Sequence, residues 1–215
     1  MASIAFYSGG LDSTAMLYLL SQTDEEIIAH HVYFETDTER DKLEMQAVEK
    51  IQKYFGDRFK WESSSISLMG APLLKQSRDV IWFSIIGAVY TAYENVDNIY
   101  FGFEHQAADV YYKQWLQTAE DLCNGVLEKA LPLSCKGDLV NEDPDKIKPY
   151  KIISPVAGLS KADEYNLLPE ELKKVVWSCR NPQRLKSGVI THCGTCEPCS
   201  EYTRHNLPFN STRLS

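Results

Sequence analysis

The pattern of apolar and polar positions along the chain predicts alternating strands and helices. Short apolar runs predict strands at residues 4–7, 27–34, 59–66, 98–103 and 152–155. Apolar residues at helical spacing predict helices that begin near residue 11 and cover residues 40–55, 80–94 and 111–131. A strand-helix-strand rhythm of about 25 residues per unit is typical of a doubly wound α/β fold with a mainly parallel sheet. Ligands of such a sheet bind at the carboxyl ends of its strands.

Three details of this pattern concern burial. The helix over residues 80–94 is apolar nearly all round, which indicates burial on several sides. His30 and His31 lie inside a predicted strand, where we expect them to be packed rather than to bind a ligand. Cys123 is expected to be a small buried hydrophobe.

Residues 134–150 are polar and contain Gly137 and two prolines, so they predict a loop excursion.

Length and charge narrow the class of partner. The chain has 215 residues, which suits one domain with a small appendage. Its formal net charge of −8 and its pI near 5.2 disfavour a broad surface for nucleic acid, so a small substrate is expected. No segment has the apolar length of a membrane span, and the chain does not start with a signal-peptide pattern. We therefore expect a cytoplasmic protein that does not associate with a membrane.

The strongest chemical signal follows the first predicted strand, at residues 8–14. Two glycines there allow a tight turn and the close approach of a ligand. The polar residues after them fall at a helix start, where unpaired amides and the positive end of the helix dipole favour a phosphate. A plain strand-turn-helix corner, capped by Ser8 or Asp12, is the alternative. The loop lacks the lysine of a Walker loop. The nucleotide candidates are Ser8, Gly9, Gly10, Leu11, Asp12, Ser13 and Thr14.

Further candidates stand at other element boundaries. Arg78 precedes the helix over residues 80–94 and is either a phosphate contact or part of an ordinary helix start. Lys161 opens a helix, where a lysine opposes the dipole unless an anion is nearby; it is either a phosphate contact or an exposed lysine. Glu104, His105 and Asp109 follow the fourth predicted strand. They suit either the rim of a substrate pocket or a solvated loop.

Four of the six cysteines lie near the end of the chain, at Cys179, Cys193, Cys196 and Cys199. Thiolates with two-residue gaps can close a tetrahedral zinc site with Zn–S bonds of about 2.3 Å. The protein would then fill all four positions, so the metal would be structural rather than catalytic. A redox pair and an iron–sulfur cluster are the alternatives. The spacing is that of a zinc ribbon and lacks a ferredoxin cysteine run.

These motifs occur in one order that resembles the 7-cyano-7-deazaguanine synthases, a family of ATP pyrophosphatases in the PP-loop superfamily. The resemblance rests on residues 8–14, the segment around Arg78, Leu159-Ser160-Lys161, Trp177-Ser178-Cys179 and the last three cysteines. It implies an adenine nucleotide α-hydrolase-like fold and a ligase of queuosine biosynthesis that uses ATP and Mg²⁺. It further implies 7-carboxy-7-deazaguanine and ammonia as substrates, catalytic roles for Asp12, Arg78 and Lys161, and a homodimer, although no apolar stripe predicts an interface.

The expected organisation is a nucleotide-binding α/β domain over residues 1–160 and a helical zinc-binding segment over residues 161–215. One segment departs from the family. The family's Tyr-Pro-Asp-Cys-Arg signature is associated with the deazaguanine substrate, and residues 109–115 read Asp-Val-Tyr-Tyr-Lys-Gln-Trp in its place. An adenylating enzyme that forms an amide or conjugate from a related carboxylate therefore stays an alternative. So does a non-catalytic nucleotide-binding module stabilised by zinc.

Overall fold

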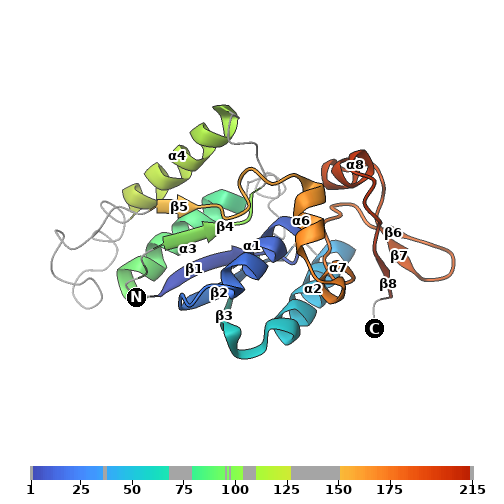
Figure 1. Cartoon of the computed structure of the whole chain (residues 1–215), viewed down its shortest axis with the longest axis horizontal. Coiled ribbons are helices and arrows are strands. Elements are labelled where there is room, and N and C mark those ends of the chain that lie inside the picture. The colour runs from blue at the N-terminus through green and yellow to red at the C-terminus, as the bar shows by residue number, and fades with distance from the viewer. Residues whose placement is uncertain are drawn as a thin grey trace.

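A five-stranded parallel sheet forms the centre of the computed structural model (Figure 1), which describes residues 2–35, 38–67, 79–94, 96, 98–103, 110–126 and 151–213. Its strands are β1 (Ser3–Tyr7), β2 (Ile27–Glu35), β3 (Lys60–Ser67), β4 (Asn98–Phe101) and β5 (Lys151–Ile153). The strand order is β3-β2-β1-β4-β5, and every pair is parallel. The direction of winding reverses between β1 and β4, which makes their carboxyl ends the expected ligand crevice.

Helices cover both faces of the sheet. They are α1 (Leu11–Ser21), α2 (Glu39–Phe55), α3 (Asp79–Glu94), α4 (Val110–Gly125), α6 (Lys161–Leu167), α7 (Glu170–Lys173) and α8 (Glu197–Arg204), with a 3-10 turn at Gly56–Arg58.

Alternate residues of β1 show how the layers are built, because successive strand side chains point to opposite faces. Ala5 and Tyr7 belong to a core that includes residues of α1 and α2. Ile4 and Phe6 belong to a second core with residues of α3 and α4. The doubly wound α/β fold expected from the sequence is confirmed.

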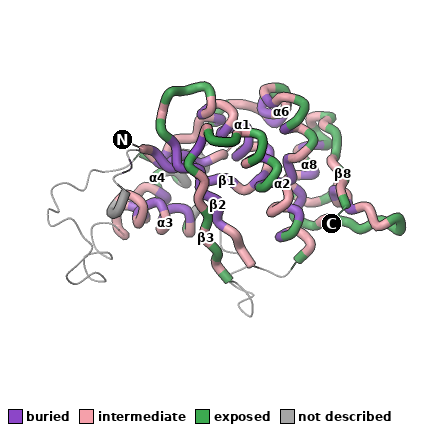
Figure 2. The backbone as a smooth tube through the Cα atoms, turned by 90° about the horizontal axis from the view of Figure 1, so that it is seen from below, coloured by how far each residue is buried: buried purple, intermediate pink, exposed green. Residues whose placement is uncertain are grey.

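The positions of β1 and β2 are mostly buried, whereas β3 at the edge of the sheet is exposed or half-buried (Figure 2). His30 and His31 are 2% and 3% exposed, as expected for packed histidines. Cys123 is fully buried, which also agrees with the expectation.

The expectation that α3 is buried on several sides agrees with most of its described positions. Among residues 81–91, the fully buried positions are Phe83, Ser84, Gly87 and Ala88, which share one face, and the others except Ile81 are half-buried. Ile81 is 43% exposed. Helix α3 packs against the sheet on one side and against α4 on another.

The C-terminal segment lies at the carboxyl end of the parallel strands (Figure 1). Besides α6, α7 and α8 it contains a small antiparallel sheet of β6 (Gln183–Arg184), β7 (Ile190–Thr191) and β8 (Ser211–Thr212). Sequence analysis did not anticipate this sheet. Leu168, Leu172, Val176 and Tyr202 pack into the same core as Ala5 and Tyr7, so the segment shares its core with the α/β layers. In the described part of the chain, no helix has the length and apolar character needed to span a bilayer.

Candidate functional site

Residues 8–10 connect β1 to α1 at the carboxyl edge of the sheet. Gly9 has a φ of +79°, a conformation that favours glycine. A Cβ at this position would also lie 3.1 Å from the Cβ of Ala47 in α2. The carbonyl of Gly9 accepts a hydrogen bond of 2.9 Å from the backbone N–H of Trp177. Glycine is therefore required here by both backbone conformation and space.

Hydroxyl groups organise the start of α1. The N–H of Ser8 donates to the Oγ of Ser13 at 3.1 Å, and the hydroxyl of Thr14 donates to the carbonyl of Gly10 at 2.7 Å. The N–H of Leu11 donates to the Oγ of Ser178 at 3.0 Å. Gly10 is the N-cap of α1 and no side chain caps it there, so the expected cap by Ser8 or Asp12 is wrong. The hydroxyl that accepts from Leu11 comes from Ser178 in the C-terminal segment. Nucleotide binding by this loop stays a prediction.

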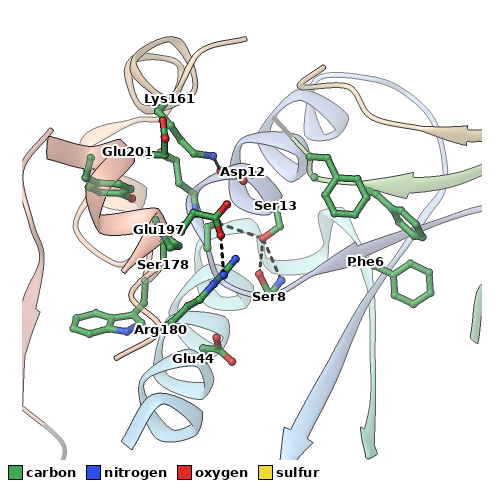
Figure 3. A pocket seen from close by; sticks show the side chains of 18 of the residues that line it. Phe6, Ser8, Asp12, Ser13, Glu44, Lys161, Ser178, Arg180, Glu197 and Glu201 are labelled. Atoms are coloured by element: carbon green, nitrogen blue, oxygen red, sulfur yellow. Dashed lines mark hydrogen bonds and ion pairs between the residues drawn. The ribbon is translucent and has the colours of Figure 1, made fainter. Parts of the chain in front are cut away.

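Lys161 joins α6 to this loop. Ser160 caps α6 by accepting a hydrogen bond from the N–H of Asp163 at 3.2 Å. The Nζ of Lys161 contacts Asp12 and lies 3.3 Å from the carboxylate of Glu164 (Figure 3). Lys161 is nearly buried, with 8% of its side chain exposed, and the side chain of Glu164 is fully buried. The anions that balance a lysine in this first helical turn are thus carboxylates of the protein.

A cavity of about 720 Å³ opens between the loop and the C-terminal segment. Its lining comes from β1, α1, α2, α3, β4, α6, α8 and the segment 177–180. The polar, charged and glycine residues in the lining include Ser8, Gly10, Asp12, Ser13, Arg40, Glu44, Lys161, Arg180 and Glu197. Gly102, which follows β4, brings this strand close to α1, since a Cβ there would lie 2.5 Å from the Cα of Ser13. The cavity therefore lies at the point where the winding of the sheet reverses.

Two arginines in the lining were not singled out from the sequence. Arg180 pairs with Glu197 at 2.8 Å, and Arg40 pairs with Glu44 at 2.7 Å. Figure 3 shows Arg180 and Glu197 facing each other across the cavity from Lys161. The available sequence signal for Arg180 was its position directly after Cys179.

The structure brings together residues 8–14 and Lys161 among the candidates. Arg78, Glu104, His105 and Asp109 lie outside the described residues, as do Cys135 and the polar residues 134–150. The roles assigned to them from the sequence stay predictions. Of the divergent stretch 109–115, residues 110–115 form the start of α4.

The four cysteines converge as the sequence predicts. All of their Sγ atoms lie within 4.8 Å of one another. The Sγ atoms of Cys193 and Cys199 are 3.9 Å apart, and those of Cys179 and Cys196 are 4.0 Å apart. A tetrahedron with Zn–S bonds of about 2.3 Å has edges of about 3.8 Å, so the cluster has the donor set and size to hold a zinc ion.

Backbone amides support this cluster. The N–H of Cys193 donates to the Sγ of Cys179 at 3.3 Å, and the N–H of Cys196 donates to the Sγ of Cys193 at 3.3 Å. Burial alone would raise the pKa of Cys193, but hydrogen bonds from Thr195 and Cys196 outweigh burial and lower this pKa to about 6. The thiolate form that binds a metal is thereby favoured at Cys193.

His192 lies beside the cluster and is not one of its four donors. Its Nδ1 is 3.8 Å from the Sγ of Cys199, and its ring meets that of Trp177 edge to face with centroids 4.6 Å apart. Burial lowers the pKa of His192 to about 4, so the ring is neutral near pH 7. Its packing ties the cysteine cluster to Trp177.

The fold and site define a doubly wound α/β protein with a glycine loop at the crevice of its sheet and an adjoining cluster of four cysteines that could hold a metal ion. No family model matches the chain. Among curated proteins, the chain is 26% identical to the 7-cyano-7-deazaguanine synthase of Methanothrix thermoacetophila, with 94% of this chain and 92% of the relative aligned. It is 24% identical to the synthase of the same name from Pyrococcus furiosus, with 92% and 88% aligned.

A third relative with this name, from Campylobacter curvus, is 26% identical, with 92% of this chain and 89% of the relative aligned. All three alignments span nearly the whole of both proteins. These three relatives support the 7-cyano-7-deazaguanine synthase family for this chain, and the low identity fits a divergent member.

Proposed function

We propose that this protein is an ATP-dependent ligase that converts 7-carboxy-7-deazaguanine and ammonia into 7-cyano-7-deazaguanine through an adenylated intermediate. The reaction would serve queuosine and 7-deazaguanine biosynthesis in the cytoplasm. The observation that carries the proposal is the match of more than nine-tenths of the chain to three synthases of this name. The glycine loop at the reversal point of the sheet supports it, because that is where a nucleotide binds in this architecture.

The loop supplies the groups that ATP needs. Helix geometry leaves the amides of Leu11, Asp12 and Ser13 without an intrahelical acceptor. Since Leu11 donates to Ser178, the amides of Asp12 and Ser13 are the ones that would face a pyrophosphate group. The Asp12 side chain is 33% exposed and lines the cavity. It would hold Mg²⁺, which when bound neutralises phosphate charge.

Lys161 and Arg180 would supply positive charge to the reaction. The Nζ of Lys161 sits at the cavity wall between two carboxylates, which fix its position. Such a fixed cation stabilises charge that develops at the α-phosphate during attack, without having to reorganise. Arg180 would reach the same phosphates from the side of the C-terminal segment.

The chemistry would proceed in two activations. The carboxylate of the substrate attacks the α-phosphate of ATP and releases pyrophosphate, which leaves an acyl adenylate. Ammonia then attacks the activated carbonyl, and AMP leaves to give an amide. The amide oxygen would then attack the α-phosphate of a second ATP and release pyrophosphate, and loss of AMP and of both amide protons would give the nitrile.

We further propose that Cys179, Cys193, Cys196 and Cys199 hold a structural Zn²⁺. The Sγ separations support this assignment, and four thiolates would leave no position on the metal for a reactive water. The zinc would therefore stabilise the C-terminal segment, and catalysis would fall to the loop and Lys161.

The direct test incubates zinc-loaded protein with Mg-ATP, ammonium and 7-carboxy-7-deazaguanine, with nucleotides and bases followed by mass spectrometry. We expect nitrile formation coupled to release of AMP and pyrophosphate. Asp12→Ala should abolish turnover, and Asp24→Ala, which removes an exposed carboxylate outside the cavity lining, should not. Absence of nucleotide turnover with every candidate carboxylate would refute the ligase and favour a zinc-stabilised binding module.

A second candidate keeps the adenylation and changes the acceptor. Residues 109–115 lack the proline, cysteine and arginine of the family's substrate signature, and this observation favours a related deazaguanine carboxylate or another amine. An amide that persists in the assay, or ATP cleavage that requires a different carboxylate, would select this candidate. Substrate profiling with a panel of deazaguanine acids and amines separates the two.

A further inference from the structure

Residues 177–179, here called the strap, join the cysteine cluster to the glycine loop. The N–H of Trp177 donates to the carbonyl of Gly9 at 2.9 Å. The Oγ of Ser178 accepts the N–H of Leu11 at 3.0 Å, across 167 residues of sequence. Cys179 follows at once and places its Sγ in the cluster. Three consecutive residues therefore contact the loop, the first turn of α1 and the metal site.

The strap fits closely against both of its neighbours. A Cβ at Gly10 would lie 3.4 Å from the Oγ of Ser178 and 3.9 Å from the carbonyl oxygen of Trp177. Trp177 is 4% exposed and Cys179 is 1% exposed. Both pack in one hydrophobic cluster with Leu43 and Ala47 of α2, and Ala47 is also the residue that a Cβ at Gly9 would touch. A shift of the strap would therefore displace residues of the glycine loop.

The position of the strap depends on the cysteine cluster. Four thiols whose sulfurs lie within 4.8 Å of one another are held together as thiolates only when a cation balances their charge. Cys179 shares this cluster with Cys193, Cys196 and Cys199, which all belong to the end of the chain. Metal binding therefore fixes Cys179, and through it the hydroxyl of Ser178 beside Leu11.

We propose that Ser178 is a positioning residue that couples metal binding at the cysteines to phosphate binding at residues 8–14. By accepting the N–H of Leu11, it orients the first turn of α1 so that the next amides face the cavity. The inference rests on the proposed function, because it takes the bound anion to be the phosphates of ATP. Coupling between two sites is reciprocal in binding free energy, so a bound nucleotide also raises the affinity for the metal.

Two measurements on the full zinc-loaded chain test the coupling. The first is the dissociation constant of the α,β-methylene analogue of ATP with Mg²⁺, measured by calorimetry. The second is the equilibrium affinity for zinc, measured by competition with a chromogenic chelator, with and without the analogue. Ser178→Ala should weaken analogue binding by about fivefold, the loss expected when a helix cap is removed. The analogue should also protect zinc less in this variant than in the wild type.

Two matched variants sharpen the test. Ser178→Thr keeps the hydroxyl and should restore most of the affinity and of the zinc protection. Ser200→Ala makes the same change at an exposed serine next to Cys199 and should behave as the wild type in both measurements. A threonine variant as weak as the alanine variant would overturn the role of the hydroxyl.

The outcomes separate this inference from the proposed function. If the wild type binds the analogue and Ser178→Ala matches it in affinity and in zinc protection, the coupling is refuted and the proposed function stands. If the zinc-loaded wild type fails to bind the analogue, both the proposed function and the coupling are refuted. A Ser200→Ala variant that shows the same losses as Ser178→Ala would also refute a specific role for Ser178.

Discussion

Replacing Lys161 with methionine should cost the protein about 3 kcal/mol of unfolding free energy at pH 7. The substitution removes the cation between Asp12 and the fully buried carboxylate of Glu164. Breaking a buried ion pair by removing one partner costs roughly 3–5 kcal/mol. The loss has a ceiling, because the variant can take up a proton on Glu164. With an ordinary glutamate pKa of about 4.3, that protonation costs about 3.7 kcal/mol at pH 7.

Because of this ceiling, the destabilisation of Lys161→Met should depend on pH. A buried carboxyl that is protonated in the folded variant and ionised in its unfolded chain makes the variant less stable as the pH rises. The destabilisation relative to the wild type should therefore shrink by about 1.4 kcal/mol for each pH unit below 7, until it levels off near pH 4.3. Urea denaturation of the two zinc-loaded proteins at several pH values, followed by circular dichroism, measures this difference in unfolding free energy.

A double variant separates the two roles of Lys161. Lys161→Met with Glu164→Gln leaves no buried charge at Glu164, so it should recover about 2 kcal/mol relative to Lys161→Met alone. Affinity for the α,β-methylene analogue of ATP should stay low, because the cation at the cavity wall is still missing. A single variant that loses less than about 1 kcal/mol, or a double variant no more stable than the single one, would refute the electrostatic reasoning. Recovery of analogue affinity in the double variant would leave Lys161 a purely structural role.

Three further predictions follow from the same structure. Cys196→Ser should lose zinc and melt the C-terminal segment, whereas Asp12→Ala should keep zinc and lose turnover; equal zinc content in the two variants, by elemental analysis, would contradict this division. Gly102→Ala should lower the unfolding free energy by about 1–3 kcal/mol, because its Cβ would overlap the backbone of α1. The control Gly125→Ala, whose Cβ would have no atom within 4 Å, should stay within about 1 kcal/mol of the wild type. Urea denaturation measures both. Burial, opposed by Glu62, lowers the pKa of His30 to about 4. The unfolding free energy should therefore fall by up to about 3 kcal/mol as the pH drops from 6.5 to 4. A His30→Gln variant whose unfolding free energy falls equally with pH would show that His30 is not the cause.

The parts of the fold that were predictable from sequence are those set by local patterns. The apolar run at residues 27–34 and the helical stripe at residues 40–55 match β2 and α2 to within a residue or so at each end. The four-cysteine cluster was predictable because ligand spacing within one short segment restricts how the thiols can meet. Gly9 and Gly10 together signalled a turn, and the φ of +79° at Gly9 is one that residues with a side chain rarely adopt.

The parts that escaped prediction depend on contacts between distant segments. The cap on Leu11 comes from Ser178, and no local pattern can indicate a partner so far along the chain. Gly102 reads as an ordinary residue after a strand, although its importance comes from its closeness to Ser13 of α1. The strands β6, β7 and β8 have two residues each, which is too short for an alternating pattern to be detected.

The exposure of Ile81 on α3 was missed for a related reason. Apolar composition tells how much of a helix can be buried, and only the tertiary arrangement tells how much is. Ile81 is apolar and 43% exposed, while Phe83 two positions later stacks on Phe6 with ring centroids 4.9 Å apart. The difference between them is set by the direction each side chain takes from an outer helix.

A structural metal has a physical reason to stand next to this cavity. Helix α8 begins directly after Cys196, includes Cys199 and carries the cavity-lining residues Glu197 and Tyr202. At eight residues it is too short to be stable on its own in water, where about 12–15 residues are marginal. Metal binding to four cysteines contributes on the order of 10 kcal/mol in finger peptides, which exceeds any shortfall of so short a helix. The proposed ligands of the metal lie on α8 and next to Ser178, so one bound ion would fix both a wall of the cavity and the amides that would face the phosphates.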